Sequence, residues 1–235
     1  MIRKIFALLI ILNLTACAEL QQVVDSLPQT DGVLSNADIA SGLRQALDQG
    51  IDKQVTKLTQ TDGFYKNDLV KILLPSELQK ADNALRKIGL SSLADEGLKA
   101  LNRAAEDAVK EATPIFVNVV NDITFNDAKN ILLGEENAAT SYLTTKTKTD
   151  LYNKFKPVIE SSFSKVGADE IWTNLITRYN NIPLTNNVNP DLTDYVTNEA
   201  LDGVYTMIAV EEKEIRSKVS SRSTALLKKV FALQD

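Results

Sequence analysis

Two adjacent acidic residues interrupt the apolar face of the last long helical stretch of the sequence. Small or apolar residues recur there every three or four positions, namely Thr197, Ala200, Val204, Ile208, Ile215 and Val219. Glu211 and Glu212 stand where this pattern should continue, and at about 100° per residue each lies within about 60° of the centre of the face. A carboxylate that points toward a core must be paired, hydrogen-bonded or protonated, so both residues are candidates for chemistry.

This acidic pair has two interpretations. Arg216 follows Glu212 by four residues and is a natural partner one helical turn away. We favour a structural ion pair at the rim of a helical bundle. The alternative is a carboxylate-dependent hydrolase with Glu211 or Glu212 as the general acid. Such an enzyme needs two carboxyl groups about 5–10 Å apart. Because adjacent residues on a helix diverge by about 100°, a residue elsewhere, such as Asp202, would have to supply the second group.

The residue types that are missing exclude other chemistries. The chain has no His and a single Cys, which rules out Ser–His–Asp and Cys–His catalysis and zinc sites built from imidazole or several thiolates. One Cys cannot form an internal disulfide. There is no glycine-rich phosphate loop, and the spacing of Asp191 and Asp194 does not match a calcium-binding loop. We therefore predict no metal and no cofactor.

The N-terminus has the pattern of a secretory signal. Arg3 and Lys4 precede an apolar run over residues 5–12, and small residues lead to Cys17. The run is too short to cross a bilayer, which takes about 20 residues. Leu14-Thr15-Ala16-Cys17 resembles the lipobox of bacterial lipoproteins. That resemblance implies removal of residues 1–16, diacylglycerol on the Cys17 sulfur and usually a further acyl chain, palmitate for example, on the new amine. At about 0.8 kcal/mol per buried methylene, such an anchor is effectively permanent.

The residues after Cys17 and the net charge bear on location and partners. Neither Ala18 nor Glu19 is an Asp, which by resemblance to sorted lipoproteins implies the outer membrane and a body facing the periplasm. Loss of residues 1–16 removes two positive charges and changes the net charge from −5 to −7. An acidic chain without a basic cluster argues against nucleic acid as a partner and against electrostatic docking on anionic lipid. Membrane contact is predicted through the lipid alone.

The remaining sequence predicts an all-α protein. Of its 235 residues, 44% are hydrophobic and 24% charged, which suits one folded domain. Residues 17–34 contain Pro28 and Gly32 with little periodicity and are predicted to form a flexible tether. From residue 35 to residue 235 the apolar spacing is helical, without convincing strand alternation or repeats. We therefore expect a compact multi-helix bundle behind a lipidated tether.

Local signals predict several helix boundaries. The first helix is expected to open at Ser35, a short one to open at Thr124 with Asp127, and the last to span residues 224–231. Asp191 is expected to cap the last long helix. Thr113-Pro114 fits a cap with a first-turn proline, or a kink.

Three further stretches carry predictions about helices and their faces. A helix is expected from residue 151, where the apolar spacing begins again. Residues 64–74 fit either a short helix or a connector entering Pro75. Asn102-Arg103 lies away from its helix's apolar stripe and is interpreted as a solvated face.

The chain also resembles an uncharacterised family of exported bacterial proteins, catalogued as domain of unknown function 4197. The stretches that carry the resemblance are Asp62-Gly63-Phe64, Leu74-Pro75, Asn102-Arg103-Ala104-Ala105-Glu106, Pro114, Asp127-Ala128, Ile131-Leu132, Asp194-Tyr195-Val196-Thr197, Ala200-Leu201-Asp202-Gly203, Glu211-Glu212-Lys213, Ile215-Arg216 and Leu227-Lys228-Lys229-Val230-Phe231. The resemblance implies helical structure. It implies no reaction, ligand or catalytic residue.

Three functional hypotheses follow from the sequence. The first is a non-enzymatic lipoprotein of the bacterial envelope that binds a protein partner or a small ligand. The second is a carboxylate-dependent hydrolase of an envelope glycan. The third is a carrier that holds an apolar ligand inside an opened bundle, and it predicts a large apolar cavity. We rank the first ahead of the other two because the sequence lacks a catalytic constellation.

Overall fold

The computed structural model describes residues 34–87, 89, 91–166, 168–181 and 191–235. The chain divides into Met1–Ser35 and a helical body, Asn36–Asp235. The predicted signal, Cys17 and all but the last residue of the predicted tether lie outside the described residues, as do residues 182–190. The body carries the acidic pair and is described below.

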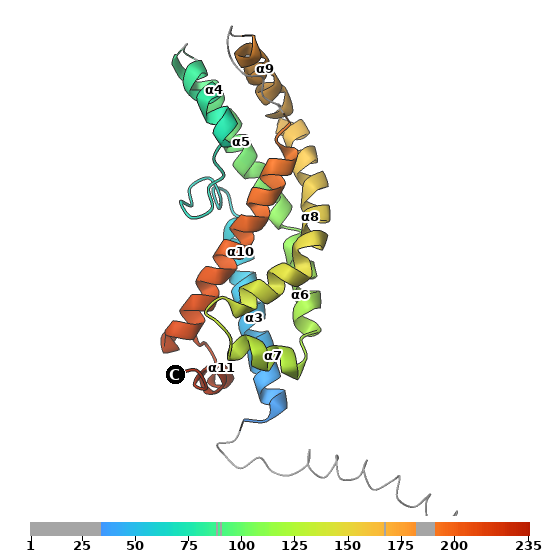
Figure 1. The fold of residues 1–235 in the computed structure, drawn as a ribbon, viewed down its shortest axis with the longest axis vertical. Coiled ribbons are helices and arrows are strands. Elements are labelled where there is room, and N and C mark those ends of the chain that lie inside the picture. Colours follow the sequence, from blue (N-terminus) through green and yellow to red (C-terminus); the bar gives the residue numbers. More distant parts are fainter. Residues whose placement is uncertain (1–33, 88, 90, 167, 182–190) are drawn as a thin grey trace, which may run out of the picture. The chain divides into compact units, whose positions relative to one another are not determined.

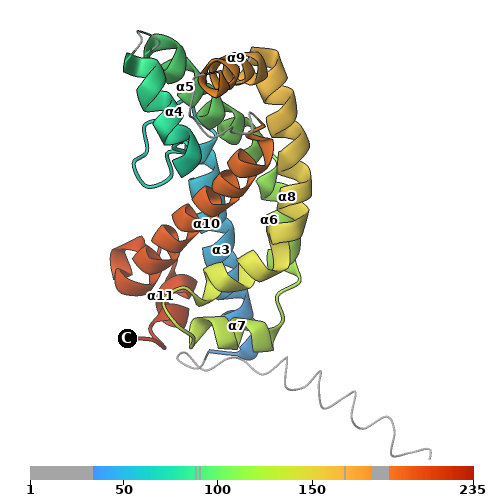
Figure 2. The ribbon, with the colours of Figure 1, turned by 45° about the horizontal axis from the view of Figure 1, so that its top comes forward.

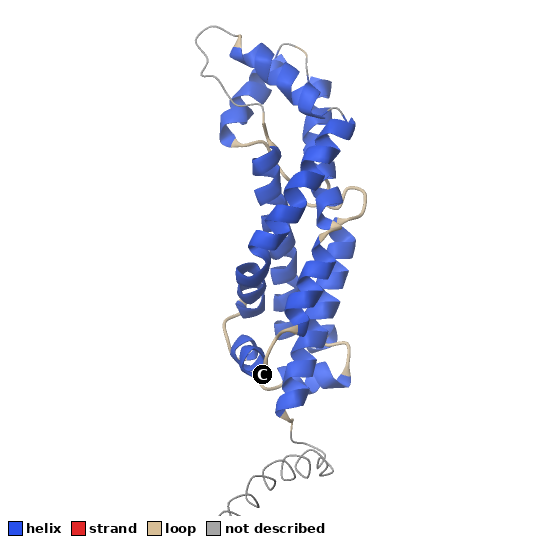
Figure 3. Ribbon diagram, turned by 90° about the vertical axis from the view of Figure 1, so that its right-hand side faces the viewer, coloured by secondary structure: helices blue, strands red, loops and turns tan. Residues whose placement is uncertain are grey.

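The regular structure of the described residues is helical throughout (Figure 3). Along the chain (Figure 1) the elements are α3 (Asn36–Leu58), α4 (Ser76–Lys87), α5 (Ser91–Val109), α6 (Ala112–Asn121), α7 (Phe125–Leu132), α8 (Ala138–Val166), α9 (Ala168–Asn180), α10 (Thr193–Ser217), the 3-10 turn η1 (Val219–Ser221) and α11 (Ala225–Phe231). The predicted all-α class is confirmed. Within the described part of the chain, no helix is both long and apolar enough to span a bilayer.

The core of the body forms where α10 packs against α3, α5 and α8. Figures 1 and 2 both show α10 running alongside α3 and crossing toward α8. On α3 one apolar face is buried, with Leu43, Leu47, Ile51, Val55 and Leu58 at 7% exposure or less. Apolar residues three or four positions apart share one face of a helix, so burial of that face fixes the orientation of α3.

Two glycines allow the closest approaches to these helices. A Cβ on Gly203 of α10 would lie 2.6 Å from Cε1 of Phe64, whose ring is completely buried. A Cβ on Gly42 of α3 would lie 2.6 Å from Cγ2 of Val230 on α11. Gly203 thereby admits the loop over residues 59–75 to the surface of α10, and Gly42 admits α11 to the surface of α3.

Most predicted helix boundaries are found. Thr124 and Asp127 form a capping box at the start of α7, and the Thr224 hydroxyl accepts a hydrogen bond from the first turn of α11. Thr113 is not a cap, because α6 already begins at Ala112 and holds Pro114 in its first turn. Residues 64–74 form a non-helical connector of turns and irregular backbone. This is one of the two structures expected there.

Two helix starts differ from expectation. Asp191 accepts a hydrogen bond from the Thr193 backbone N–H at 2.9 Å, but the N-cap position of α10 belongs to Leu192. Helix α8 begins at Ala138, well before the predicted start at residue 151. Its first half is rich in threonine, which disfavours helix when exposed. Hydroxyls such as those of Thr144 and Thr147 donate instead to the carbonyl four residues earlier in the helix.

Candidate functional site

Glu212 caps a helix from outside it. Its carboxylate accepts hydrogen bonds from the backbone N–H groups of Ala139 (2.9 Å) and Thr140 (2.8 Å), and from the Thr140 hydroxyl (2.8 Å). These N–H groups belong to the first turn of α8, which has no carbonyl partners for them and carries the positive end of the helix dipole. The Glu212 side chain therefore holds α10 against the start of α8, and the residue is only 8% exposed.

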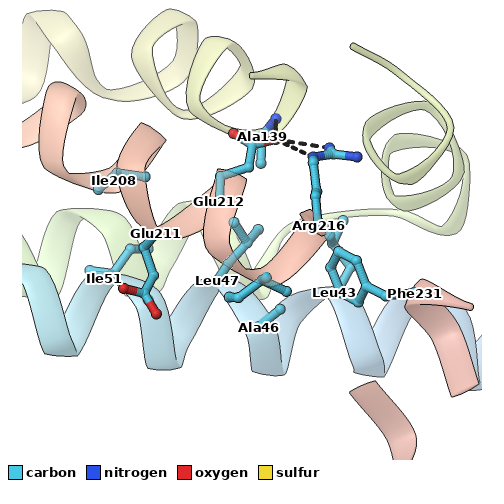
Figure 4. A pocket seen from close by; sticks show the side chains of 12 residues that line it. Leu43, Ala46, Leu47, Ile51, Ala139, Ile208, Glu211, Glu212, Arg216 and Phe231 are labelled. Atoms are coloured by element: carbon cyan, nitrogen blue, oxygen red, sulfur yellow. Dashed lines mark hydrogen bonds and ion pairs between the residues drawn. The ribbon is translucent and has the colours of Figure 1, made fainter. Parts of the chain in front are cut away.

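Arg216 makes the complementary contact at the end of the preceding helix. Its guanidinium donates to the carbonyls of Ile131 (2.8 Å) and Leu132 (3.1 Å), the last residues of α7. Its Nε and Nη2 also donate to Glu212 at 2.9 and 2.8 Å, as Figure 4 shows. Each charge thus lies at the helix end whose dipole it complements. Together the pair joins α10 to both sides of the α7–α8 turn.

Glu211 faces a different helix. Figure 4 shows its carboxylate directed along α3 and away from Glu212. It accepts hydrogen bonds from Nζ of Lys53 (2.8 Å) and from Nε2 of Gln54 (2.7 Å). Gly50 leaves room for this contact, because a Cβ there would lie 3.2 Å from Cγ of Glu211. Glu211 therefore fastens α10 to α3 through an ion pair with an exposed lysine.

A cavity of about 30 Å³ lies beside the acidic pair. Its apolar walls include Leu43, Leu47, Ile51, Ile208 and Phe231. A single water needs roughly 10–15 Å³, so this cavity has room for a water molecule or two. A lipid chain or a sugar is far larger. The cavity therefore does not meet the expectation of a large apolar space for a carried ligand.

Asp202 does not join the acidic pair. It is exposed and lies ten residues before Glu212 on the same helix. At 1.5 Å per residue this separates the two by about 15 Å along the axis. The structure therefore brings together Glu211, Glu212 and Arg216 as lining residues of one cavity and leaves Asp202 apart. A paired-carboxylate reaction at about 5–10 Å would need a different partner. No group of residues suited to a metal ion occurs among those the structure describes.

Asn102 is a buried polar residue on α5. Its side chain is completely buried, so the expectation of a solvated face is wrong. The amide oxygen accepts from the Ile72 N–H (2.8 Å), and the amide nitrogen donates to the carbonyls of Ile72 and Leu98 (2.9 Å each). The buried N–H and carbonyl of Ile72 need hydrogen-bond partners. The Asn102 side chain supplies both, as a neighbouring strand would in a sheet. The loop over residues 59–75, which includes the connector, covers this face of α5; from here on the whole loop is called the connector.

Arg103 and Glu106 complete the attachment of the connector. Arg103 donates to Asp62 and to Glu106 at 2.6 Å each, and Glu106 accepts from the Phe64 N–H at 3.2 Å. A hydrogen bond from Lys66 and the positive charges of Lys66 and Arg103 hold the pKa of Asp62 below its ordinary value. These contacts join two stretches that the family resemblance had named separately. Their long separation in sequence left no local signal for the pairing.

Arg222 is a second buried guanidinium that the sequence did not indicate. Only 2% of it is exposed. Its Nε and Nη2 donate to the carbonyls of Ile215 and Arg216 at the end of α10, and it holds both carboxylate oxygens of Asp235 at 2.7 Å. The hydrogen bond from Arg222 lowers the pKa of Asp235. Like Arg216, this residue satisfies carbonyls that a helix end leaves unpaired.

Fold and site together define an all-α protein in which three largely buried charged residues, Glu212, Arg216 and Arg222, bind the ends of its own helices. The chain belongs to a family described as protein of unknown function (DUF4197), whose model matches residues 33–232. The family indicated by the sequence motifs is therefore confirmed. No curated protein and no solved structure matches the chain.

Proposed function

We propose that the protein is a lipoprotein of the bacterial envelope, attached to the membrane through Cys17, and that its helical body acts by binding rather than by catalysis. The sequence Leu14-Thr15-Ala16-Cys17 after a short apolar run carries the first half of this proposal. The outer membrane is the proposed location, because neither residue after Cys17 is an Asp.

The occupied state of the acidic pair supports the binding role. A general acid must present its carboxyl group to a substrate oxygen. Both oxygens of Glu212 already accept hydrogen bonds within the body, and both oxygens of Glu211 contact Lys53 or Gln54. A structural role accounts for all these contacts. The cavity of about 30 Å³ beside them likewise gives little support to an apolar-ligand carrier.

Metabolic labelling with a fatty acid tests the anchor. Because Cys17 is the only Cys of the chain, label in the protein reports on its N-terminal modification. We expect the wild type to be labelled and to sediment with membranes, and Cys17→Ser to be unlabelled and to retain residues 1–16. An unlabelled wild-type chain of full length in the cytosol would contradict the anchor.

A second variant tests the location. Ala18→Asp places an acidic residue directly after the lipidated Cys while leaving the lipobox intact. We expect this variant to remain labelled and to shift from the outer-membrane to the inner-membrane fraction. An unchanged distribution would show that these residues do not sort the protein.

Chemical cross-linking in intact envelopes tests the binding role. We expect the wild-type chain to form reproducible adducts with an envelope component. Absence of any reproducible adduct or co-purifying ligand would count against a binding protein.

A further inference from the structure

An open groove of about 580 Å³ lies between residues 71–75, the start of α4 and the first turns of α10. Its lining includes Lys71, Leu73, Pro75, Gln79, Tyr195 and Glu199. We call it the Glu199 groove. Its volume falls within the range of about 300–1,000 Å³ that is usual for small-ligand sites. The groove is separate from the acidic pair on the same helix.

The walls of the Glu199 groove are held in place before any ligand arrives. The Tyr195 hydroxyl donates to the Leu73 carbonyl at 2.8 Å, and Nε2 of Gln79 donates to the Leu74 carbonyl at 3.1 Å. A carbonyl can only accept, so the Gln79 amide nitrogen must face Leu74. The Gln79 amide oxygen therefore remains as an acceptor. A preformed site loses little entropy when it binds.

Glu199 has no cation of its own. The residue is half-buried, and no hydrogen bond or ion pair joins it to another residue in the part of the chain that the structure describes. Burial, together with the negative charge of Asp202, raises the pKa of Glu199. The other charge in the groove is Lys71, whose Nζ lies 4.6 Å from the centre of the Tyr65 ring. A carboxylate partly removed from water is stabilised by a cation that reaches it.

An exposed apolar side chain lines the same groove. Leu73 is 55% exposed. The connector is nevertheless well anchored, since Phe64 and Ile72 are completely buried beneath it. An exposed leucine on a fixed backbone offers apolar surface to the methylenes of a long side chain. The net charge of −7 for residues 17–235 adds a long-range attraction for cationic partners.

We propose that the Glu199 groove binds a basic side chain, lysine or arginine, from a peptide segment of a protein partner with apolar residues on either side. The cationic head lies against Glu199 and the Gln79 amide oxygen. The aliphatic stem lies along Leu73 and Tyr195, because long basic side chains bury their methylenes on apolar surface. This inference rests on the proposed binding role and does not depend on the lipid at Cys17.

Fluorescence anisotropy with a labelled peptide tests the proposal. The probe is fluorescein-Gly-Leu-Lys-Leu-Gly, titrated with the full chain in a mild detergent. Two control peptides carry norleucine or glutamate in place of lysine. We expect the lysine peptide to bind most tightly and Glu199→Gln to weaken it about tenfold, as for loss of a charged hydrogen bond. Glu214→Gln is the matched control, because it removes the same charge from the same helix at a carboxylate that pairs with Lys218.

Several outcomes would overturn the proposal. They are no binding, equal binding of the norleucine or glutamate peptide, or equal affinity of the Glu199→Gln variant and the wild type. Circular dichroism must show both variants folded, which we expect because Glu199→Gln removes no hydrogen bond or ion pair found in the described part of the chain. A dimer in light scattering that Glu199→Gln dissociates would assign the groove to a second copy of the chain. Fatty-acid labelling of Cys17 is measured separately, so failure of the anchor and failure of the groove are distinguishable.

Discussion

Replacing Glu212 by Gln tests whether the acidic pair holds the body together. Oε1 of Glu212 accepts from the Ala139 N–H and from Arg216, whereas Oε2 accepts from the Thr140 N–H and hydroxyl. A Gln amide has one acceptor and one NH2 group. Either orientation of that amide therefore places an NH2 group against existing donors. We expect Glu212→Gln to destabilise the fold strongly.

The size of the effect follows from burial. Breaking a buried ion pair by removing one charge costs about 3–5 kcal/mol, and each hydrogen bond to a charged group contributes about 1.5–3 kcal/mol. Glu212 is 8% exposed, and the Arg216 side chain is 10% exposed, so solvent can replace little of the lost interaction. Gln retains one acceptor, which places the expected loss near the lower bound, at about 3 kcal/mol.

Urea unfolding followed by circular dichroism measures this loss in free energy of unfolding. The matched control is Glu214→Gln, because its carboxylate pairs with Lys218 at the surface and should contribute less than about 1 kcal/mol. The reasoning is refuted if the two variants lie within about 0.5 kcal/mol of each other with unchanged denaturant slopes. The same comparison bears on a hydrolase, which would require a Glu212→Gln variant that is inactive but as stable as the wild type.

A double-mutant cycle with Arg216→Met then separates the pair from its helix contacts. If the two residues act as a unit, the cost of Arg216→Met will be smaller in the Glu212→Gln background. The expected coupling free energy is about 1–3 kcal/mol. Simple additivity would mean that each residue stabilises its own helix end independently.

Three further predictions concern the connector and the groove. Asn102→Leu should cost about 2–4 kcal/mol in chemical denaturation, because it leaves the buried N–H and carbonyl of Ile72 unpaired. Gly203→Ala should lower the melting temperature despite its better helix propensity, because its Cβ would lie 2.6 Å from Phe64. Burial raises the pKa of Glu199 above its unfolded value of about 4.3, so the folded protein binds more protons than the unfolded chain between the two pKa values. The free energy of unfolding therefore falls as pH rises through that interval. Glu199→Gln should therefore be more stable than the wild type at pH 7, with the difference vanishing at pH 4.

Local sequence patterns were sufficient for the helices that carry their own signals. The stripe of α3 and the capping box of Thr124 and Asp127 involve residues within a turn or two of one another. Helix α8 is different, because its first turn is capped by Glu212, more than 70 residues away. Its threonines hide the apolar period that would have indicated a helix. Tertiary contact overrides propensity there.

The candidate site was likewise predictable only where its contacts are local in sequence. Periodicity singled out Glu211 and Glu212, and the four-residue spacing supplied Arg216 as a partner, a contact that the structure contains. The α7 carbonyls and the α8 N–H groups could not be inferred, because they approach the pair only after the chain folds. Asn102 was misjudged for a related reason. A helix face without apolar residues predicts contact with solvent, but a polar loop backbone covers this one.

The buried charges form hydrogen bonds within the body, whereas the Glu199 carboxylate forms none in the described part of the chain. Glu212 lies at the start of α8, while Arg216 and Arg222 donate to carbonyls at the ends of α7 and α10. Each therefore carries the sign that its helix end attracts, and its contacts lie within the body. Glu199 sits in the second turn of α10, where the dipole also favours an anion, yet its carboxylate faces an open groove. A negative charge held in place without an ion pair is stabilised further by a cation that enters the groove. For that reason the search for a partner should begin at the Glu199 groove rather than at the more prominent acidic pair.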